Sequence, residues 1–121
     1  MIRIELTDRA HFDLQAIESY SIANFGEKVA EKYINDIEAA LLLLQECPQL
    51  LKQKTNISDF FSFYRVRQHF LICTQIDNSI FVLSIKHVSM DIPNRIAELE
   101  PTLLLETQQL HKTLKLTKRL D

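Results

Sequence analysis

The chain has 121 residues, of which 46% are hydrophobic and 25% are charged, with a single glycine and three prolines. This composition predicts one globular domain with a modest core and excludes a disordered or low-complexity chain. The net charge of −2 is unevenly placed: residues 1–50 carry four Lys or Arg against nine Asp or Glu, and residues 51–121 carry ten against seven. We expect an anionic partner to bind the second half, although the chain lacks the basic excess of a dedicated nucleic-acid-binding protein.

The sequence carries no signal of a membrane protein and none of a cofactor-dependent enzyme. The N-terminal residues are charged at every few positions, unlike a signal peptide, and the longest leucine run, residues 41–44, is too short to span a membrane. We therefore expect a cytoplasmic protein. Cys47 and Cys73 lie far apart and are expected to be reduced thiols. Without a Ser–His–Asp order, a glycine-rich phosphate loop or paired Cys/His ligands, no metal and no cofactor is predicted.

The first half of the chain predicts a strand followed by two helices. Apolar and charged residues alternate over residues 1–6, as in a half-buried strand. Thr7 can cap the first helix and Gly26 stops it, while Pro48 ends the second. The very short loop between the helices predicts an antiparallel hairpin. The apolar stripe of the first helix comprises Ala10, Leu14, Ile17, Ser21 and Phe25, and that of the second comprises Ala30, Tyr33, Ile34, Ile37, Leu41 and Leu44.

The second half predicts three strands and a helical C-terminus. After a polar connection over residues 48–59, the segments 60–66, 70–76 and 80–86 are rich in aromatic and β-branched residues. Turns are expected at Arg67-Gln68-His69 and at Asp77-Asn78-Ser79. Asp91 can cap a short helix from Ile92 to Leu99, and a separate helix is expected after Pro101. The result is an α+β fold, with an N-terminal strand and with the helices on one face of a small antiparallel sheet.

Positively charged residues and histidines gather near the predicted strand ends. Arg65, Arg67 and His69 occupy alternating positions, so they are predicted to share one face of the sheet, with Lys86 and His87 nearby. Such a cluster can hold a phosphate and move a proton, as RNA cleavage through the 2′-hydroxyl requires. A solvated sheet face explains the same residues without a function, and both interpretations stay open. The basic segment 111–119 is equally a nucleic-acid contact or a solvated helix end.

The order of short motifs along residues 2–99 resembles the ParE branch of the RelE/ParE toxins. The motifs are Leu6-Thr7-Asp8-Arg9-Ala10, Tyr20, Phe25-Gly26, Ala30-Glu31-Lys32-Tyr33, Pro48, Arg65-Val66, His69, Leu71-Ile72 and His87-Val88-Ser89-Met90-Asp91. Two departures stand out: Arg67 occupies a turn position where the family usually has Gly, and residues 101–121 extend past the common core. The resemblance implies a toxin domain over residues 1–99, with residues 100–121 as a helical extension of the same domain.

The resemblance also implies partners and sites. A ParE-like toxin is a growth-inhibiting protein of plasmid-stabilising gene pairs, which binds and poisons DNA gyrase, is neutralised by a ParD-like antitoxin and reaches DNA indirectly through the antitoxin complex. The expected target surface comprises Arg65, Arg67, Lys86, His87, Met90, Asp91 and Arg95. The expected antitoxin surface comprises Tyr33, Ile37, Leu41, Leu44, Phe61 and Phe63.

Two alternatives to a gyrase toxin remain. A RelE-like toxin would cut mRNA on the ribosome, and here only Arg65 and His87 can take catalytic roles, because no tyrosine follows Tyr64. The missing late tyrosine favours the ParE interpretation, in which the protein is not an enzyme. The second alternative is a relative that binds an antitoxin without being toxic.

Overall fold

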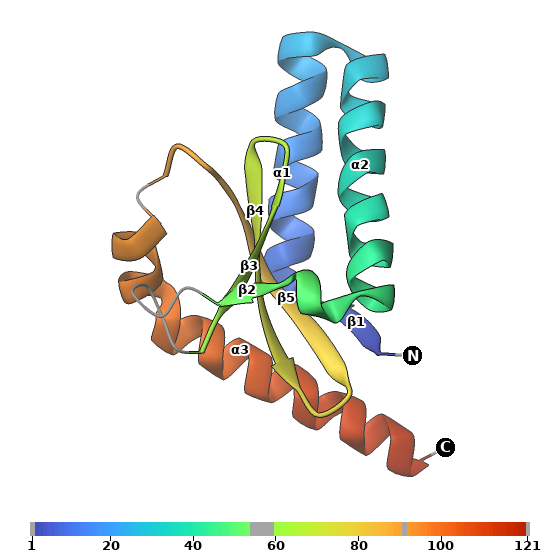
Figure 1. Cartoon of the computed structure of the whole chain (residues 1–121), viewed down its shortest axis with the longest axis vertical. Coiled ribbons are helices and arrows are strands. Elements are labelled where there is room, and N and C mark those ends of the chain that lie inside the picture. Colours follow the sequence, from blue (N-terminus) through green and yellow to red (C-terminus); the bar gives the residue numbers. More distant parts are fainter. Residues whose placement is uncertain (1, 54–59, 91, 121) are drawn as a thin grey trace.

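The computed structural model of the chain describes residues 2–53, 60–90 and 92–120, and the positions of its elements are shown in Figure 1. The first half contains β1 (Arg3–Leu6), α1 (Asp8–Phe25), α2 (Glu27–Glu46) and a 3₁₀ turn, η1 (Pro48–Leu50). The second half contains β2 (Lys52–Gln53), β3 (Ser62–Val66), β4 (His69–Ile76), β5 (Ser79–His87) and α3 (Ile92–Leu120). The predicted α+β fold, with its helix hairpin and C-terminal helix, is confirmed.

The strands form one mixed sheet in the order β1-β5-β4-β3-β2. The strands β2 to β5 pair antiparallel, whereas β1 lies parallel to β5 at the edge. The strand β2 was not predicted, since its two residues lie in the segment expected to be a polar connection. Both hairpin turns hold two residues, because Val66 pairs with His69 and Ile76 pairs with Ser79.

The sheet is covered on both faces, so the expectation that all helices lie on one face is wrong. One core cluster joins α1 and α2 to the sheet through residues such as Ile37, Leu71 and Val82. A second cluster joins Phe63 and Phe81 to Leu103 of α3, which crosses the sheet on the side away from the hairpin (Figure 1). The apolar run of residues 80–83 in β5, whose four side chains are all fully buried, is the pattern of a strand covered on both sides.

The C-terminal helix α3 is continuous through Pro101, so the predicted break at this proline is wrong. A proline inside a helix removes one hydrogen bond and costs about 3 kcal/mol. Tertiary contacts offset this cost, because Leu103 and Thr107, within two turns after Pro101, are both fully buried. The boundary expected between residues 99 and 100 therefore falls inside a helix.

The two helices of the hairpin begin and end where the sequence predicts. The Thr7 hydroxyl accepts the N–H of Ala10 at 3.1 Å, which caps α1. Gly26 alone separates α1 from α2, and its φ of +88° is open to glycine at little cost. Its N–H still donates to the Ile22 carbonyl at 3.0 Å, which satisfies the end of α1. The predicted antiparallel hairpin is thereby confirmed.

Candidate functional site

The edge of β5 changes partner halfway along its length. The strand β1 pairs with β5 only as far as Val82, and Thr7 then continues the contact by donating its hydroxyl to the Leu83 carbonyl at 3.0 Å. Next along this edge, the Asp13 carboxylate accepts the N–H of Ile85 at 3.0 Å and the hydroxyl of Ser84 at 2.6 Å. Its other oxygen lies 3.6 Å from Lys86 Nζ. Asp13 therefore fixes to α1 the part of β5 that β1 does not reach.

Beside this contact, a groove of about 650 Å³ lies between the helix hairpin and the end of β5. Apolar side chains from α1, α2 and β5 make up most of its lining, and the largest exposed ones are Tyr20 at 64%, Phe25 at 62% and Val29 at 51%. The polar part of the lining comprises Asp13, Ser21, Tyr33, Gln68, His69, Lys86 and His87, and Met90 also lines the groove. Phe25, expected in the core stripe of α1, is thus a surface residue. This is a large open apolar surface bordered by titratable groups.

Tyr33, His69 and His87 form a row along the polar side of the groove. The Tyr33 hydroxyl lies 2.6 Å from His69 Nδ1 and accepts the N–H of Gln68 at 3.1 Å. The rings of His69 and His87 meet edge to face with centroids 5.2 Å apart. Burial, followed by the charge that His87 can carry, lowers the pKa of His69 to about 4. His69 is therefore neutral around pH 7.

The chain leaves β5 through a tight turn over residues 87–90. The Met90 N–H donates to the His87 carbonyl at 3.1 Å, and the Val88 N–H donates to the Gln68 carbonyl at 2.8 Å. The Ser89 N–H donates to His87 Nδ1 at 3.0 Å, and the Ser89 hydroxyl lies 2.7 Å from the same nitrogen. Since a backbone N–H can only donate, His87 Nδ1 is an acceptor here and carries no proton.

Arg65 and His69 do not share a face of the sheet, so the predicted Arg–His cluster is wrong. Arg65 pairs across the strands with Phe70, which packs on the α3 side, whereas His69 faces Tyr33 of α2. His87 pairs with His69 and lies on the same side as it. Arg65 and His87 therefore belong to opposite faces. The prediction from alternating side chains fails here because it assumes one continuous strand, whereas the turn at residues 67–68 reverses the chain between Arg65 and His69.

Arg67, at the turn position where the family resemblance implied glycine, adopts a backbone conformation that glycine reaches more easily. Its φ is +53°, in the left-handed region that disfavours most side chains. Its guanidinium forms an ion pair with Asp36 and lies over the Tyr33 ring at 5.5 Å from the centroid. These contacts with α2 hold the β3–β4 turn to the hairpin and offset the backbone cost.

Most of the expected antitoxin surface lies inside the protein. Ile37, Leu44, Phe61 and Phe63 are at most 2% exposed, so a partner cannot contact them in this fold. Leu41 and Tyr33 pack on the first core cluster, and only Tyr33 lines the groove. The sequence pattern identified apolar side chains correctly but could not separate core residues from exposed ones.

The expected target surface is only partly brought together. Lys86, His87 and Met90 line one end of the groove, whereas Arg67 is turned toward α2 and Arg65 lies on the other face. Asp91 and the side chain of Arg95 lie outside the described residues. The residues that sequence reasoning missed are Asp13, Tyr20, Phe25 and Val29 as parts of one site. Tyr20 and Phe25 were visible as motif residues, but nothing in the sequence marked them as exposed.

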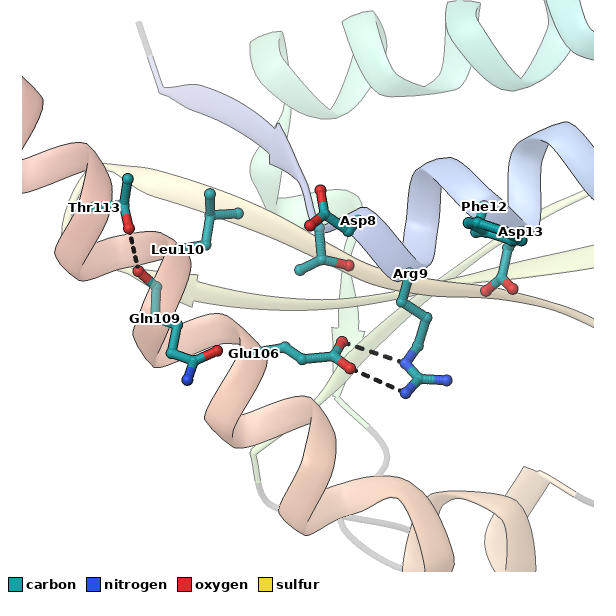
Figure 2. Close-up of a pocket in the computed structure, with 9 residues that line it drawn as sticks. Asp8, Arg9, Phe12, Asp13, Glu106, Gln109, Leu110 and Thr113 are labelled. Carbon is teal, nitrogen blue, oxygen red and sulfur yellow. Dashed lines mark hydrogen bonds and ion pairs between the residues drawn. The ribbon is translucent and has the colours of Figure 1, made fainter.

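A second pocket, also of about 650 Å³, separates α1 from α3 (Figure 2). Arg9 of α1 points across it and binds Glu106 of α3 through both carboxylate oxygens, at 2.9 and 3.3 Å. In the turn between β4 and β5, the Oδ2 atom of Asp77 lies 3.1 Å from His111 Nε2 and 3.8 Å from Lys115 Nζ. These ion pairs connect α3 to the rest of the domain, so this pocket is explained by the packing of α3.

The described residues were searched for a metal-binding cluster, a reactive thiol and a membrane-spanning helix. Within them, no cluster of three or more His, Cys, Asp or Glu side chains is arranged to hold a metal ion. Both cysteines are free, and burial raises the pKa of Cys73 to about 12, which leaves it as an unreactive thiol. No helix in the described part of the chain combines the length and apolarity needed to cross a membrane.

Comparison with known proteins identifies the family. Residues 4–92 match the family described as "ParE toxin of type II toxin-antitoxin system, parDE". The chain belongs to the ParE toxin family. The chain is similar to a solved structure described as "Chromosomal ParDE TA system from P. aeruginosa", with a TM-score of 0.64 and 19% sequence identity. The match covers 72% of this chain and 96% of the chain in that structure. No match was found among curated proteins.

The family match covers the groove of this ParE family member but not α3. The matched residues end at position 92, where α3 begins, so α3 lies beyond the matched part of the chain. The groove, Asp13 and the row of Tyr33, His69 and His87 all lie within the matched part.

Asp13→Ala is expected to lower the free energy of unfolding by about 2–3 kcal/mol, because it leaves the Ile85 N–H and the Ser84 hydroxyl without their acceptor. Asp36→Ala is the matched control, since its ion pair with Arg67 is 38–44% exposed and is expected to contribute less than about 1 kcal/mol. Urea unfolding of the two variants checks the difference. Equal losses would contradict the role given to Asp13.

His69 is expected to make the fold sensitive to acid. Its pKa is about 4 in the folded chain and about 6.5 when unfolded, so the unfolded state takes up more protons and stability falls as the pH falls from 6.5 toward 4. After allowance for partial solvent screening, the expected loss between pH 7 and pH 5 is about 1–2 kcal/mol. His69→Gln, which does not titrate, should lose less, and the exposed His11→Gln should match the unmodified protein in urea unfolding at both pH values.

Proposed function

We propose that this ParE family member is a toxin that inhibits DNA gyrase by binding to it and is neutralised by a cognate ParD-like antitoxin. Membership of the ParE family supports the class of protein. The observation that carries the proposal is the open groove, whose exposed Tyr20, Phe25 and Val29 form an apolar surface of the kind that binds a protein segment. Gyrase inhibition of this type needs binding and no chemistry by the toxin.

The antitoxin is proposed to lay an apolar segment into the groove between α1, α2 and β5. Antitoxin segments that fold on binding gain affinity by covering apolar surface, and the groove offers three large exposed side chains from two rigid helices. The buried side chains Ile37, Leu44, Phe61 and Phe63 support this seat from within the core, without direct contact to the partner.

Neutralisation is proposed to follow from overlap of two surfaces. Lys86, His87 and Met90, three of the residues proposed to contact gyrase, also line the groove. A segment seated there would cover them, and the toxin could not bind both partners through the same residues. Arg67, Asp91 and Arg95 complete the proposed target surface, while Arg65 is expected to contribute least because it lies on the other face of the sheet.

The RelE-like alternative is less well supported by this geometry. Arg65 and His87 lie on opposite faces of the sheet, and a phosphate cannot be held by one while the other moves its proton. The Arg65 Nε also donates to the Arg67 carbonyl at 2.8 Å, which directs the guanidinium along the turn. We therefore retain gyrase binding as the proposed activity and ribosomal mRNA cleavage as the outcome to examine if it fails.

Replacement of two groove side chains should weaken antitoxin binding strongly. Phe25→Asp with Val29→Asp is expected to weaken the complex by about 100-fold, because two exposed apolar contacts of about 1.5 kcal/mol each are lost. Leu42→Asp with Leu43→Asp is the control, since these side chains of α2 are 64% and 40% exposed and lie outside the groove. Calorimetric titration with the purified antitoxin checks both pairs, and equal weakening would move the binding surface elsewhere.

The purified protein is expected to inhibit gyrase supercoiling and to accumulate cleaved DNA as its concentration rises. Met90→Ala with Arg95→Ala should reduce both effects, whereas Lys112→Ala with Lys115→Ala, in the basic part of α3, should not. An agarose-gel assay that scores supercoiled and cleaved DNA together provides the measurement. A folded protein without effect on gyrase would refute this activity, and ribosome-bound mRNA would be tested next.

A further inference from the structure

The helix hairpin carries a second groove, of about 420 Å³, which is lined by α1 and α2 alone. Its apolar part comprises Ala30 and Ile34, which are buried, and Ile22, which is 42% exposed. Among the described residues that line it, none is Lys or Arg. Carboxylates supply its charge, and they belong to Glu18, Glu27, Glu31 and Glu38.

These four carboxylates lack a cation of their own. All four belong to exposed residues, and none of them forms an ion pair with another residue in the described part of the chain. Lys28 and Lys32 of α2 lie outside the lining of this groove. Because like charges repel, a cation among the carboxylates lowers the electrostatic energy, and the exposed Ile22 offers apolar surface to cover. The groove therefore fits a segment that combines cations with apolar side chains.

The basic end of α3, residues 107–120, is such a segment. It contains four Lys or Arg and no Asp or Glu, and its leucines alternate with the cations. Lys112 is exposed, and the side chain of Lys115 is 61% exposed although its Nζ lies 3.8 Å from Asp77. The charge of this helix end is thus opposite to that of the groove on the hairpin.

The basic end of α3 cannot enter the groove of its own chain. The turn between α1 and α2, which the groove adjoins, lies at one end of the molecule, and α3 ends at the other (Figure 1). The ion pairs of Arg9 with Glu106 and of Asp77 with His111 also hold α3 in place. In an antiparallel pair of copies, each basic end comes to the hairpin turn of the other copy. Two-fold symmetry then makes the two contacts identical and closes the assembly at a dimer.

We propose that two copies of this chain form an antiparallel dimer, in which the basic end of α3 of each copy lies in the α1–α2 groove of the other. The opposite charges of the two surfaces carry this inference, together with their places at opposite ends of the molecule. No described residue lines both this groove and the proposed antitoxin groove, so the dimer leaves the antitoxin groove open. The dimer is therefore independent of the proposed function.

Sedimentation velocity of the full chain tests the association. At about 100 μM protein and about 50 mM salt, the unmodified protein should sediment as a dimer. In about 500 mM salt its dissociation constant should rise by about tenfold or more, because salt screens exposed charges. A monomer in about 50 mM salt would overturn the proposal.

Charge reversal on either surface should separate the copies. The groove variant carries Glu18→Lys, Glu31→Lys and Glu38→Lys. The basic-end variant carries Lys112→Glu, Lys118→Glu and Arg119→Glu. Glu27, in the first turn of α2, and Lys115, beside Asp77, are left unchanged so that local contacts are kept. Each variant alone should be a monomer, because like charges then face each other, and a variant that is still a dimer as stable as the unmodified one would overturn the proposal.

An equimolar mixture of the two variants controls for loss of folding. The basic end of the groove variant then meets an unmodified groove, and the reversed groove meets a reversed helix end. A dimer should return in the mixture, with a dissociation constant within about tenfold of that of the unmodified protein. Thermal unfolding confirms that each variant is folded, and two folded variants that stay monomeric in the mixture would contradict the reciprocal contact.

DNA is the other partner that a basic helix end could bind. Fluorescence anisotropy with a labelled DNA duplex, in the same salt, separates this outcome from the dimer. We expect negligible binding of the duplex, because the chain has a net charge of −2 and the dimer covers the basic end of α3. A monomeric protein that binds the duplex, with binding lost in the basic-end variant, would assign this surface to DNA and overturn the proposal.

Discussion

The carboxylate of Asp13 completes the edge of β5 where β1 stops, and the geometry of the site depends on this contact. A parallel strand of four residues covers only the first part of a nine-residue strand, so the remaining polar groups of the edge need another partner. One side chain from the second turn of α1 supplies it. The same carboxylate holds α1 against the end of β5 beside the groove.

Two cores on opposite faces of the sheet leave the groove as a separate surface. The hairpin buries its stripe on one face, and α3 covers the aromatic side chains of the other. Tyr20, Phe25 and Val29 belong to neither core, although they are as apolar as the residues that do. Apolar side chains that remain exposed on rigid helices beside a tight turn are well placed for binding a segment from another protein.

The motif His87-Val88-Ser89-Met90 gains a physical meaning from the fold. His87 accepts the turn hydrogen bond, Ser89 donates it and Met90 reaches the groove. Because His69 opposes His87 across the strands, the two histidines of the family pattern are in contact although eighteen positions separate them in the sequence. In this fold the motif is a tight turn at the border of the groove.

Local signals in the sequence determined the elements of this protein. Thr7, Gly26 and Pro48 placed the helix ends, and the apolar runs placed the three long strands, because capping, backbone freedom and side-chain alternation act over a few residues. The ordered motifs also identified the ParE family. The face on which α3 lies, its continuity through Pro101 and the parallel pairing of β1 were decided only in the tertiary structure. So were the exposure of Phe25 and the separation of Arg65 from His69. Each of these depends on which distant surface a side chain packs against. The neighbouring residues in the sequence do not indicate that surface, because the contact forms between segments far apart in the chain.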